Sequence, residues 1–472
     1  MSMALTQEEI RKIVEEALAS YVPVLNQEQE EDSSQMGIFR ELEDAIAAAG
    51  ITQKRVQAMP LDLREQVIKN IRLRTRENAK LFAELAVKET GMGNTRDKIK
   101  KHYLVADKTP GTEDLVTTAW SGDRGLTLVE SGPFGVIGAV CPCTNPSETV
   151  ICNTIGMFAA GNTVVFMPHP AAKEVSSRAV DMVNRASVEA GGPANIAVAV
   201  KDPTMEISQR VFRHPDISLL VATGGPGVVS AVLSSGKRAM GAGAGNPPVL
   251  VDETANIPKA AKDIVDGCTF DNNLPCFTEK EVIAVDKIAD ELIYYMKQAG
   301  CYQATAHEVK KLIGTVFVQK DGKRTLNRQC VGRSAKALLE KIGVTVGEEV
   351  RCIIFEGDKT NPLIWEELMM PVLGIVRVPN VEEGIRAAVE LEHGNKHSAH
   401  MHSTNIHNLT KFGKAVDTAI FVKNAPSYAG LGFGSEGYTT FSICSRTGEG
   451  LTSARSFTKS RRCVMSDALC IR

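Results

Sequence analysis

Short apolar segments alternate with helical stretches along most of this chain, and this alternation limits the folds that the chain can adopt. In the first half, strands are predicted at residues 126–130, 135–140, 162–167, 196–200, 219–222 and 249–251. In the second half, they are predicted at residues 281–285, 351–355, 373–378 and 419–422. Because strands separated by helices form βαβ units, the pattern predicts two α/β domains with parallel sheets.

The length and charge of the chain agree with this fold class and exclude several kinds of partner. With 472 residues, the chain is too long for one hydrophobic core, so two or three domains are expected. Hydrophobic residues make up 43% and charged residues 23%, which is typical of a protein that folds in water. The formal net charge of -2 gives no general attraction to nucleic acids or acidic membranes, so neither is expected as a partner.

The 11 cysteines form no recognisable metal or disulfide pattern. Cys141 and Cys143 are the closest pair, and one intervening residue does not match the CxxC spacing of zinc or redox sites. Most are therefore expected to be reduced thiols in a cytoplasmic protein. No secretory signal is recognised, and no apolar run approaches the roughly 18 residues of a membrane span.

The two ends of the chain differ from its centre in their pattern of polar and apolar residues. Residues 5–20 are predicted to form an amphipathic helix, and residues 21–36 are so polar that a flexible linker is expected. The helix could fold back on the rest of the chain, pair with another subunit, or bind a separate partner. Residues 456–472 mix polar and apolar side chains, as a strand at a sheet edge or between subunits does.

Cys276 is the strongest candidate for a catalytic residue. It ends the segment Asp-Asn-Asn-Leu-Pro-Cys at 271–276, and a cysteine between a rigid proline and a turn can be presented at the end of an element. A thiolate is a strong nucleophile near neutral pH. On this segment alone, the alternative that Cys276 is a small buried hydrophobic residue stays open.

Three further segments could contribute to a site at the ends of the predicted strands. A strand leads to Asn145, whose amide could donate a hydrogen bond to an oxyanion or could be an ordinary turn residue. The turn Thr223-Gly224-Gly225 lies between a strand and a helix, where it could bind a phosphate or be a plain loop. The three glycines of 241–245 indicate close backbone approach or unusual dihedral angles.

Taken in order with Cys276, these segments resemble the aldehyde dehydrogenase superfamily over nearly the whole chain. Five motifs are similar to those of the CoA-acylating propionaldehyde and acetaldehyde dehydrogenases of bacterial microcompartments. They are Asp-Asn-Asn-Leu-Pro-Cys at 271–276, Gly-Ala-Gly-Ala-Gly-Asn-Pro-Pro at 241–248, Glu-Leu-Met-Met-Pro-Val at 367–372, Phe-Val-Lys-Asn-Ala-Pro-Ser-Tyr-Ala-Gly at 421–430 and Thr-Gly-Glu-Gly-Leu-Thr-Ser-Ala-Arg-Ser-Phe at 447–457. The resemblance implies an α/β fold with a Rossmann-type parallel-sheet NAD domain, an α/β catalytic domain and a C-terminal oligomerisation strand.

The resemblance also implies an order of domains along the chain. The implied domains are a targeting helix at 1–20, a flexible linker at 21–36, an NAD-binding domain at 37–250 with an oligomerisation strand near 118–131, a catalytic domain at 251–445 and a C-terminal oligomerisation segment at 446–472.

By resemblance, Cys276 attacks the aldehyde carbon, and the Asn145 side chain together with the backbone N–H of Cys276 holds the oxyanion that forms. Hydride then passes to NAD⁺ and a thioester remains on Cys276. The residues implied for cofactor binding are Glu367 at the nicotinamide ribose, Thr223, Gly224 and Gly225 at the pyrophosphate, and Pro168 and His169 at the adenosine ribose.

Two departures from the wider superfamily indicate the acyl acceptor and the cofactor. Hydrolytic relatives carry a glutamate that activates water, and Gly241 is interpreted as occupying that position here. Without this base, the thioester would persist until the thiol of coenzyme A attacks it, which gives an acyl-CoA. His169 stands where hydrolytic relatives usually have a lysine, and an imidazole carries little positive charge near pH 7. This favours NAD⁺ over NADP⁺, unless His169 is simply a packed loop residue.

Two groups of polar residues near the site receive no catalytic role. The four histidines within 393–402 have spacings that suggest a metal, but no nearby cysteines or acids complete a ligand shell, and the resembled family has a similar loop without a catalytic metal. No metal is therefore expected. Glu279 and Lys280 are predicted to be a solvated pair on a helix after Cys276.

The leading hypothesis is an enzyme that oxidises propionaldehyde, or acetaldehyde, with NAD⁺ and coenzyme A to acyl-CoA and NADH. By resemblance, residues 5–20 would dock on a shell protein in the lumen of a bacterial microcompartment, and the enzyme would be a homodimer or homotetramer. One alternative is a hydrolytic aldehyde dehydrogenase, which Gly241 disfavours. The other is an inactive shell-bound scaffold, which the presence of Cys276, Asn145 and Glu367 together disfavours.

Overall fold

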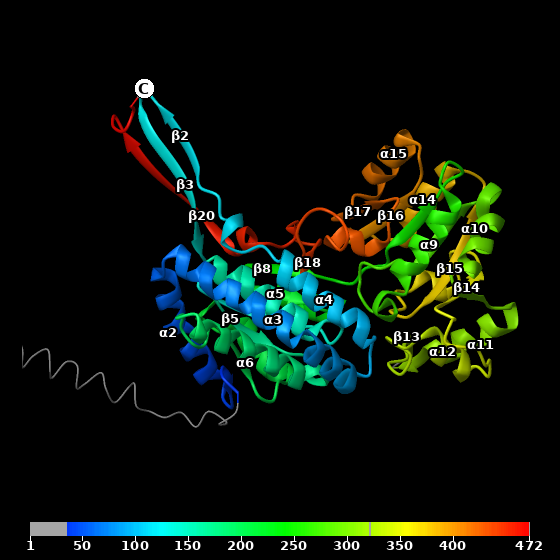
Figure 1. Cartoon of the computed structure of the whole chain (residues 1–472), viewed down its shortest axis with the longest axis horizontal. Coiled ribbons are helices and arrows are strands. Elements are labelled where there is room, and N and C mark those ends of the chain that lie inside the picture. Colours follow the sequence, from blue (N-terminus) through cyan, green and yellow to red (C-terminus); the bar gives the residue numbers. More distant parts are fainter. Residues whose placement is uncertain (1–34, 321, 472) are drawn as a thin grey trace, which may run out of the picture.

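The computed structural model describes residues 35–320 and 322–471, which form two α/β units and a projecting three-stranded ribbon (Figure 1). The predicted targeting helix at 5–20 and all but the last two residues of the predicted linker lie outside the described residues.

The first unit is built on a six-stranded parallel sheet in the order β1-β6-β5-β4-β7-β8. Its strands are β1 (Ile38–Phe39), β4 (Val136–Val140), β5 (Thr163–Met167), β6 (Ala197–Val200), β7 (Ile217–Thr223) and β8 (Ala239–Ala242). The chain adds β5 and β6 on one side of β4 and then places β7 and β8 on its other side. The strand order therefore reverses between β4 and β7, where α/β proteins bind ligands beyond the carboxyl ends of the strands. The predicted Rossmann-type sheet is confirmed.

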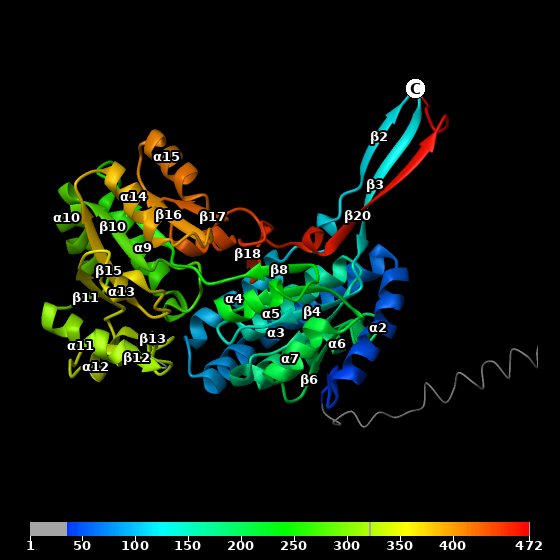
Figure 2. The ribbon, with the colours of Figure 1, turned by 180° about the vertical axis from the view of Figure 1, so that it is seen from behind.

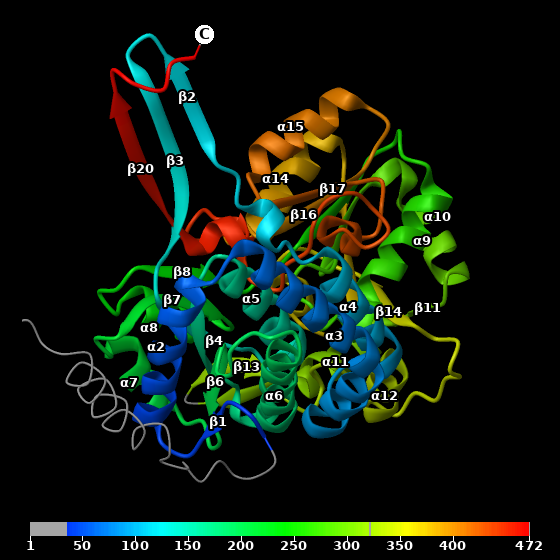
Figure 3. The same ribbon diagram turned by 60° about the vertical axis from the view of Figure 1, so that its left-hand side comes forward.

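Helices cover both faces of this sheet, as Figure 3 shows. Alternate residues of a strand point to opposite faces, so Ile137 and Ala139 contact one helical layer while Val136 contacts the other. The first layer contains α3 (Leu61–Thr90), α5 (Pro146–Ala159) and α6 (Lys173–Glu189), with α4 (Thr95–Lys108) packed beside α3 and α5. The second contains α2 (Leu42–Ala58), α7 (Met205–Arg213) and α8 (Pro226–Leu233).

The second unit has a seven-stranded parallel sheet in the order β11-β14-β15-β10-β9-β16-β17. Its strands are β9 (Pro248–Val251), β10 (Glu281–Val285), β11 (Cys301–Gln303), β14 (Cys352–Glu356), β15 (Val372–Val378), β16 (Ser398–His402) and β17 (Ile420–Lys423). Its main helices are α9 (Ile257–Cys268), α10 (Asp286–Gln298), α11 (Ala306–Val316), α12 (Ala335–Lys341), α14 (Val381–Leu391) and α15 (Ile406–Val416). The predicted second α/β alternation is confirmed.

The strand predicted at 249–251 belongs to the second sheet, so its assignment to the first domain is wrong. β9 lies between β10 and β16, with Val249 opposite Val282 on one side and His400 on the other. An apolar run indicates a buried strand but carries no information about which sheet receives it. The first sheet is completed by β1 and β8, which were not predicted.

The ribbon consists of β2 (Thr118–Gly122), β3 (Gly125–Pro133) and β20 (Thr458–Ser466), paired antiparallel in the order β2-β3-β20. It projects from the first unit in both opposite views (Figures 1 and 2), and the strand predicted at 126–130 lies in it. Trp120, Val464 and Met465 are exposed along the ribbon.

Among the helices that the structure describes, none combines the length and apolar character that crossing a bilayer requires.

Candidate active site

Cys276 lies in a loop that is held in an unusual backbone conformation. The 3₁₀ turn η3 (Phe270–Asn273) precedes it, and Asp271, Asn272 and Asn273 have φ angles of 49°, 57° and 59°. Asn and Asp occupy this left-handed region more readily than other residues with a side chain. The Asn272 amide donates to the carbonyl of Gly332 at 2.9 Å, and the Asn273 amide donates to the carbonyl of Glu279 at 2.8 Å. The Asp-Asn-Asn sequence therefore shapes the loop that presents the thiol.

Lys280 supports the same loop from the inside, and only 3% of its surface is exposed. Its ammonium donates to the Asn273 carbonyl at 2.9 Å and side-chain oxygen at 2.6 Å, and to the carbonyl of Pro275 at 3.2 Å. Glu279 is also buried, and the N–H of Ser427 donates to its carboxylate at 2.9 Å. The predicted solvated helical pair is therefore wrong, because these residues form the buried entry to β10 and have separate partners.

The surroundings of Cys276 disfavour its ionised form. Burial, together with the nearby Glu367 carboxylate, raises the pKa of the Cys276 thiol to about 12, while the Lys280 ammonium acts in the opposite direction. Burial also raises the pKa of Glu367 to about 7, although Lys280 and the N–H of Gly245 lower it. The structure thus brings Glu367, which lies between α13 (Pro362–Trp365) and β15, into the neighbourhood of the cysteine.

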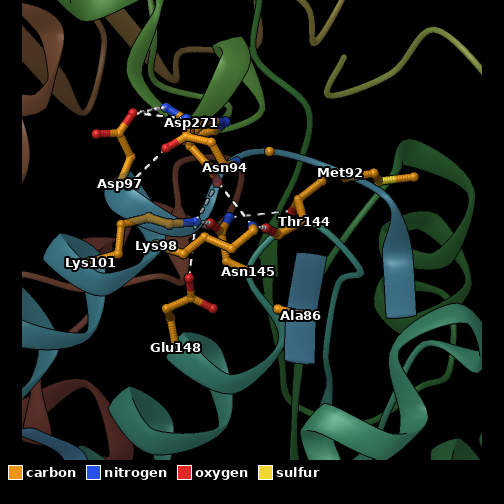
Figure 4. Close-up of polar contacts among 12 residues, drawn as sticks. Ala86, Met92, Asn94, Asp97, Lys98, Lys101, Thr144, Asn145, Glu148 and Asp271 are labelled. Carbon is orange, nitrogen blue, oxygen red and sulfur yellow. Dashed lines mark hydrogen bonds and ion pairs between the residues drawn. The ribbon is translucent and has the colours of Figure 1, made fainter. Parts of the chain in front are cut away.

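Asn145 follows β4 and precedes α5, and only 7% of its surface is exposed. Its side-chain oxygen accepts a hydrogen bond from the Lys101 ammonium at 2.6 Å. Lys101 also donates to Asp271 at 2.7 Å, so the predicted oxyanion donor and the nucleophile loop share one neighbour (Figure 4). Neither Lys101 nor Asp271 was predicted as a site residue.

The turn predicted to bind pyrophosphate lies at the carboxyl end of β7, next to the reversal of strand order. Thr223 Oγ1 is 2.7 Å from Ser442 Oγ, and the N–H of Gly224 donates to the carbonyl of Ala242 at 3.2 Å. Gly225 is exposed and precedes Pro226 at the start of α8, with no atom within 4 Å of an added Cβ. Open backbone at a helix N-terminus suits a phosphate, so this turn fits a dinucleotide.

Pro168 and His169 lie just after β5, at the same edge of the first sheet. His169 Nδ1 accepts a hydrogen bond from the N–H of Ala171 at 3.1 Å. Burial, together with the charge of Arg328, lowers the pKa of His169. The ring is therefore neutral at pH 7. A neutral ring at this position is the reason for which the sequence favours NAD⁺ over NADP⁺.

Position 241 faces a helix and leaves no space for a longer side chain. A Cβ added to Gly241 would be 2.9 Å from Val229 in α8, and the Gly241 N–H donates to Thr447 Oγ1 at 3.1 Å. The glycine of this segment that contacts the nucleophile loop is Gly245. The interpretation of Gly241 as the site of a missing base stays a prediction. A side chain at position 241 would point toward α8, which argues against this interpretation.

The histidines of 397–402 support the site through the fold. His400 Nε2 is 3.0 Å from the carbonyl oxygen of Phe277, the residue after Cys276. Burial lowers the pKa of His397 to about 4 and of His400 to about 3, so both rings are neutral. Within the described ranges, no group of three or more His, Cys, Asp or Glu side chains is arranged to hold a metal ion.

The Rossmann-type sheet, the second α/β unit and the cysteine loop next to Asn145 and Glu367 together define an aldehyde dehydrogenase. The profile of the aldehyde dehydrogenase family matches residues 14–437, and the chain belongs to this family. The family predicted from the motifs is thus confirmed.

Within the family, the chain is similar to CoA-acylating members. It is 48% identical over 437 residues to the acetaldehyde dehydrogenase (acetylating) EutE of Salmonella typhimurium, which covers 92% of this chain and 93% of that protein. A propionaldehyde dehydrogenase from the fucose utilisation bacterial microcompartment of Clostridium phytofermentans is 62% identical, with a TM-score of 0.91 over 93% of this chain and 100% of that one. The propionaldehyde dehydrogenase of Rhodopseudomonas palustris, solved with CoA and an acylated cysteine, is 50% identical, with a TM-score of 0.90 over 92% and 99% of the two chains.

Proposed function

We propose that this protein oxidises a short-chain aldehyde with NAD⁺ and coenzyme A, giving an acyl-CoA and NADH through a thioester on Cys276. The observation that carries the proposal is that Lys101 links Asn145 to Asp271 in the loop of Cys276, while the Glu367 carboxyl lies near the same cysteine. The likeness to enzymes that form acyl-CoA, one of them solved with an acylated cysteine, supports it.

The residues of the chain divide the work as follows. Once the Cys276 thiol has lost its proton, its sulfur forms a bond to the aldehyde carbon, and the carbonyl oxygen becomes an oxyanion that the Asn145 amide and the Cys276 N–H stabilise by donating hydrogen bonds. NAD⁺, when bound, accepts the hydride that leaves this carbon. The thiolate of coenzyme A then attacks the thioester, and Cys276 leaves as a thiolate, so each turnover releases one acyl-CoA, one NADH and one proton.

We assign the cofactor to the carboxyl edge of the first sheet, facing Glu367 of the second unit. Thr223, Gly224 and Gly225 bind the pyrophosphate, Pro168 and His169 lie at the adenosine ribose, and Glu367 lies at the nicotinamide ribose beside Cys276. Propionaldehyde is the favoured substrate and acetaldehyde the second.

One assay tests the activity. Propionaldehyde and NAD⁺ are supplied with and without coenzyme A while NADH absorbance and thioester are followed. We expect sustained NADH formation and propionyl-CoA only with coenzyme A, and Cys276→Ser should abolish both. Sustained NADH formation without coenzyme A, with the free acid as product, would instead establish the hydrolytic alternative. No turnover under any condition would establish the scaffold.

We also propose that the enzyme is a homo-oligomer assembled through the ribbon, and that it resides in the lumen of a bacterial microcompartment. Exposed apolar side chains and unpaired strand edges on the ribbon support the first statement. The microcompartment origin of a relative supports the second. Residues 5–20 bind a shell protein, so a variant without residues 1–20 should keep its turnover and no longer co-purify with shells; continued co-purification would contradict this role.

A further inference from the structure

Lys101 lies at the centre of a fully buried polar cluster that no step above uses. Lys98, Lys101, Glu148 and Asp271 each expose 1% or less of their side chains. Lys101 Nζ is 2.7 Å from Asp271 Oδ2, 3.0 Å from Glu148 Oε1 and 2.6 Å from Asn145 Oδ1. The two lysines and the two carboxylates have opposite charges, so the cluster is neutral as a whole when all four are ionised.

The contact with Lys101 fixes which way the Asn145 amide points. An ammonium has three N–H donors and no acceptor, so only the oxygen of the amide can face it. The Asn145 NH₂ group must therefore point away from Lys101. Among the described residues, its one hydrogen bond is a weak one of 3.3 Å to Thr144 Oγ1, which leaves donor capacity for a substrate (Figure 4).

The same ammonium connects two segments that come from different units. Asn145 directly precedes α5 in the first unit, while Asp271 begins the left-handed stretch that leads to Cys276. Lys101, on α4, holds both through bonds of 2.6 and 2.7 Å. Burial alone would disfavour the charged lysine, but the two carboxylates raise the pKa of Lys101 above its ordinary value, so it stays a cation.

We infer that Lys101 is a positioning residue, which holds the Asn145 amide with its N–H donors facing the aldehyde oxygen and keeps this amide in register with the Cys276 loop. The inference rests on the proposed role of Asn145 as oxyanion donor. Lys101 itself touches no reacting atom, so its effect on rate passes through Asn145.

A double-mutant cycle between Lys101→Met and Asn145→Ala tests this coupling. The readout is the rate constant of NADH formation in a single turnover, with KM for propionaldehyde measured beside it. Removing an oxyanion donor costs about 10²- to 10³-fold in rate, and Lys101→Met alone should cost about 10- to 100-fold because misplacement of a reacting group has such effects. KM should change by less than about threefold, since the contact acts on the transition state.

The decisive comparison is Lys101→Met in the Asn145→Ala background. If Lys101 acts through Asn145, the second substitution should change the rate by less than about threefold, because residues that share one function are not additive. Independent, multiplying losses would overturn the inference, as would an unchanged rate in Lys101→Met. If Asn145→Ala itself kept the full rate, the oxyanion role of Asn145 would be wrong, which distinguishes failure of the proposed function from failure of the inference.

Two further variants separate positioning from folding. Lys98→Met is the matched control, because Lys98 is equally buried and donates to Asp271 at 3.0 Å and to the Thr144 carbonyl at 3.3 Å, whereas the hydrogen bond to the Asn145 side chain comes from Lys101. It should lower the melting temperature about as much as Lys101→Met while changing the rate by less than about threefold; an equal loss of rate would overturn the inference. If Lys101→Met does not fold, the cycle is repeated in a Glu148→Gln background, and the rate of the double variant Lys101→Met/Glu148→Gln is compared with that of Glu148→Gln alone. In this background Asp271 still pairs with Lys98, so the loss of Lys101 leaves no buried carboxylate without a cation.

Discussion

Gly245 lies directly against the nucleophile loop, so that a Cβ added to it would be 2.7 Å from the carbonyl oxygen of Cys276. The same Cβ would be 3.0 Å from Cγ of His397. Both neighbours are held in place, because the loop is tied to Lys280 and His397 is buried directly before β16. The loop can therefore hold Cys276 in its present position only because residue 245 has no side chain.

Gly245→Ala should displace Cys276. We expect kcat/KM for propionaldehyde to fall by about 100-fold and the free energy of unfolding to fall by about 1–3 kcal/mol, as in other overpacked sites. The matched control is Gly314→Ala in α11, where no atom lies within 4 Å of an added Cβ, and its turnover should stay at the original level. Retention of activity in Gly245→Ala would show that the loop position is not critical.

Lys280→Met should damage both the loop and the reaction. The substitution leaves the carbonyls of Asn273 and Pro275 without their buried donor, and each buried acceptor left unsatisfied costs about 1–3 kcal/mol. It also removes the charge of Lys280 that lowers the pKa of Cys276, although burial lowers the pKa of Lys280 itself. The pH at which Cys276 is alkylated by iodoacetamide should therefore rise. A melting temperature and an alkylation profile like those of the unmodified protein would contradict this role of Lys280.

The buried histidines should make the fold sensitive to acid. Burial lowers the pKa of His400 and of His402 to about 3, whereas a histidine in an unfolded chain titrates near 6.5. The unfolded state therefore binds protons between pH 6.5 and 3 that the folded state does not, so the stability present above pH 6.5 is lost as the pH falls. His400→Gln keeps a donor for the carbonyl of Phe277, and its melting temperature should fall less steeply from pH 6.5 to 4.5. Equal slopes would exclude His400 as a cause.

Removal of residues 458–472 should leave the two α/β units folded and reduce the oligomer. β20 pairs with β3 along its whole length, from Thr458 opposite Pro133 to Ser466 opposite Gly125. Light scattering should then report a smaller particle, while the far-ultraviolet dichroism stays close to that of the full chain. An unchanged particle mass would mean that subunits associate through another surface.

The parts of the fold that follow from apolar periodicity could be predicted, and the parts set by long-range partners could not. β4, β5 and β7 are buried runs with helices between them, so their sequence indicates a parallel sheet. The sequence of β9 has the same character, but its sheet is decided by pairing with His400 and Val282 far along the chain. Local sequence carries no such information.

The site was predicted to a similar extent and for a similar reason. Cys276 and Asn145 lie in sequence motifs that indicate their chemistry. Charged residues such as Lys280 and Lys101 are usually solvated, so their sequence does not indicate a buried role. These lysines are buried because segments that are distant in sequence pack together, as the contact between Lys101 and Asp271 shows. One local signal was available: three consecutive Asp or Asn residues at 271–273 favour the left-handed backbone that the structure shows.

The ribbon also orders events during synthesis. β3 emerges from the ribosome early, but its partner β20 can pair with it only after residues 134–457 have been made and, in large part, folded. Until then one edge of β3 is without its strand. The β2–β3 hairpin can form early, whereas the complete three-stranded ribbon is among the last parts of the molecule to form.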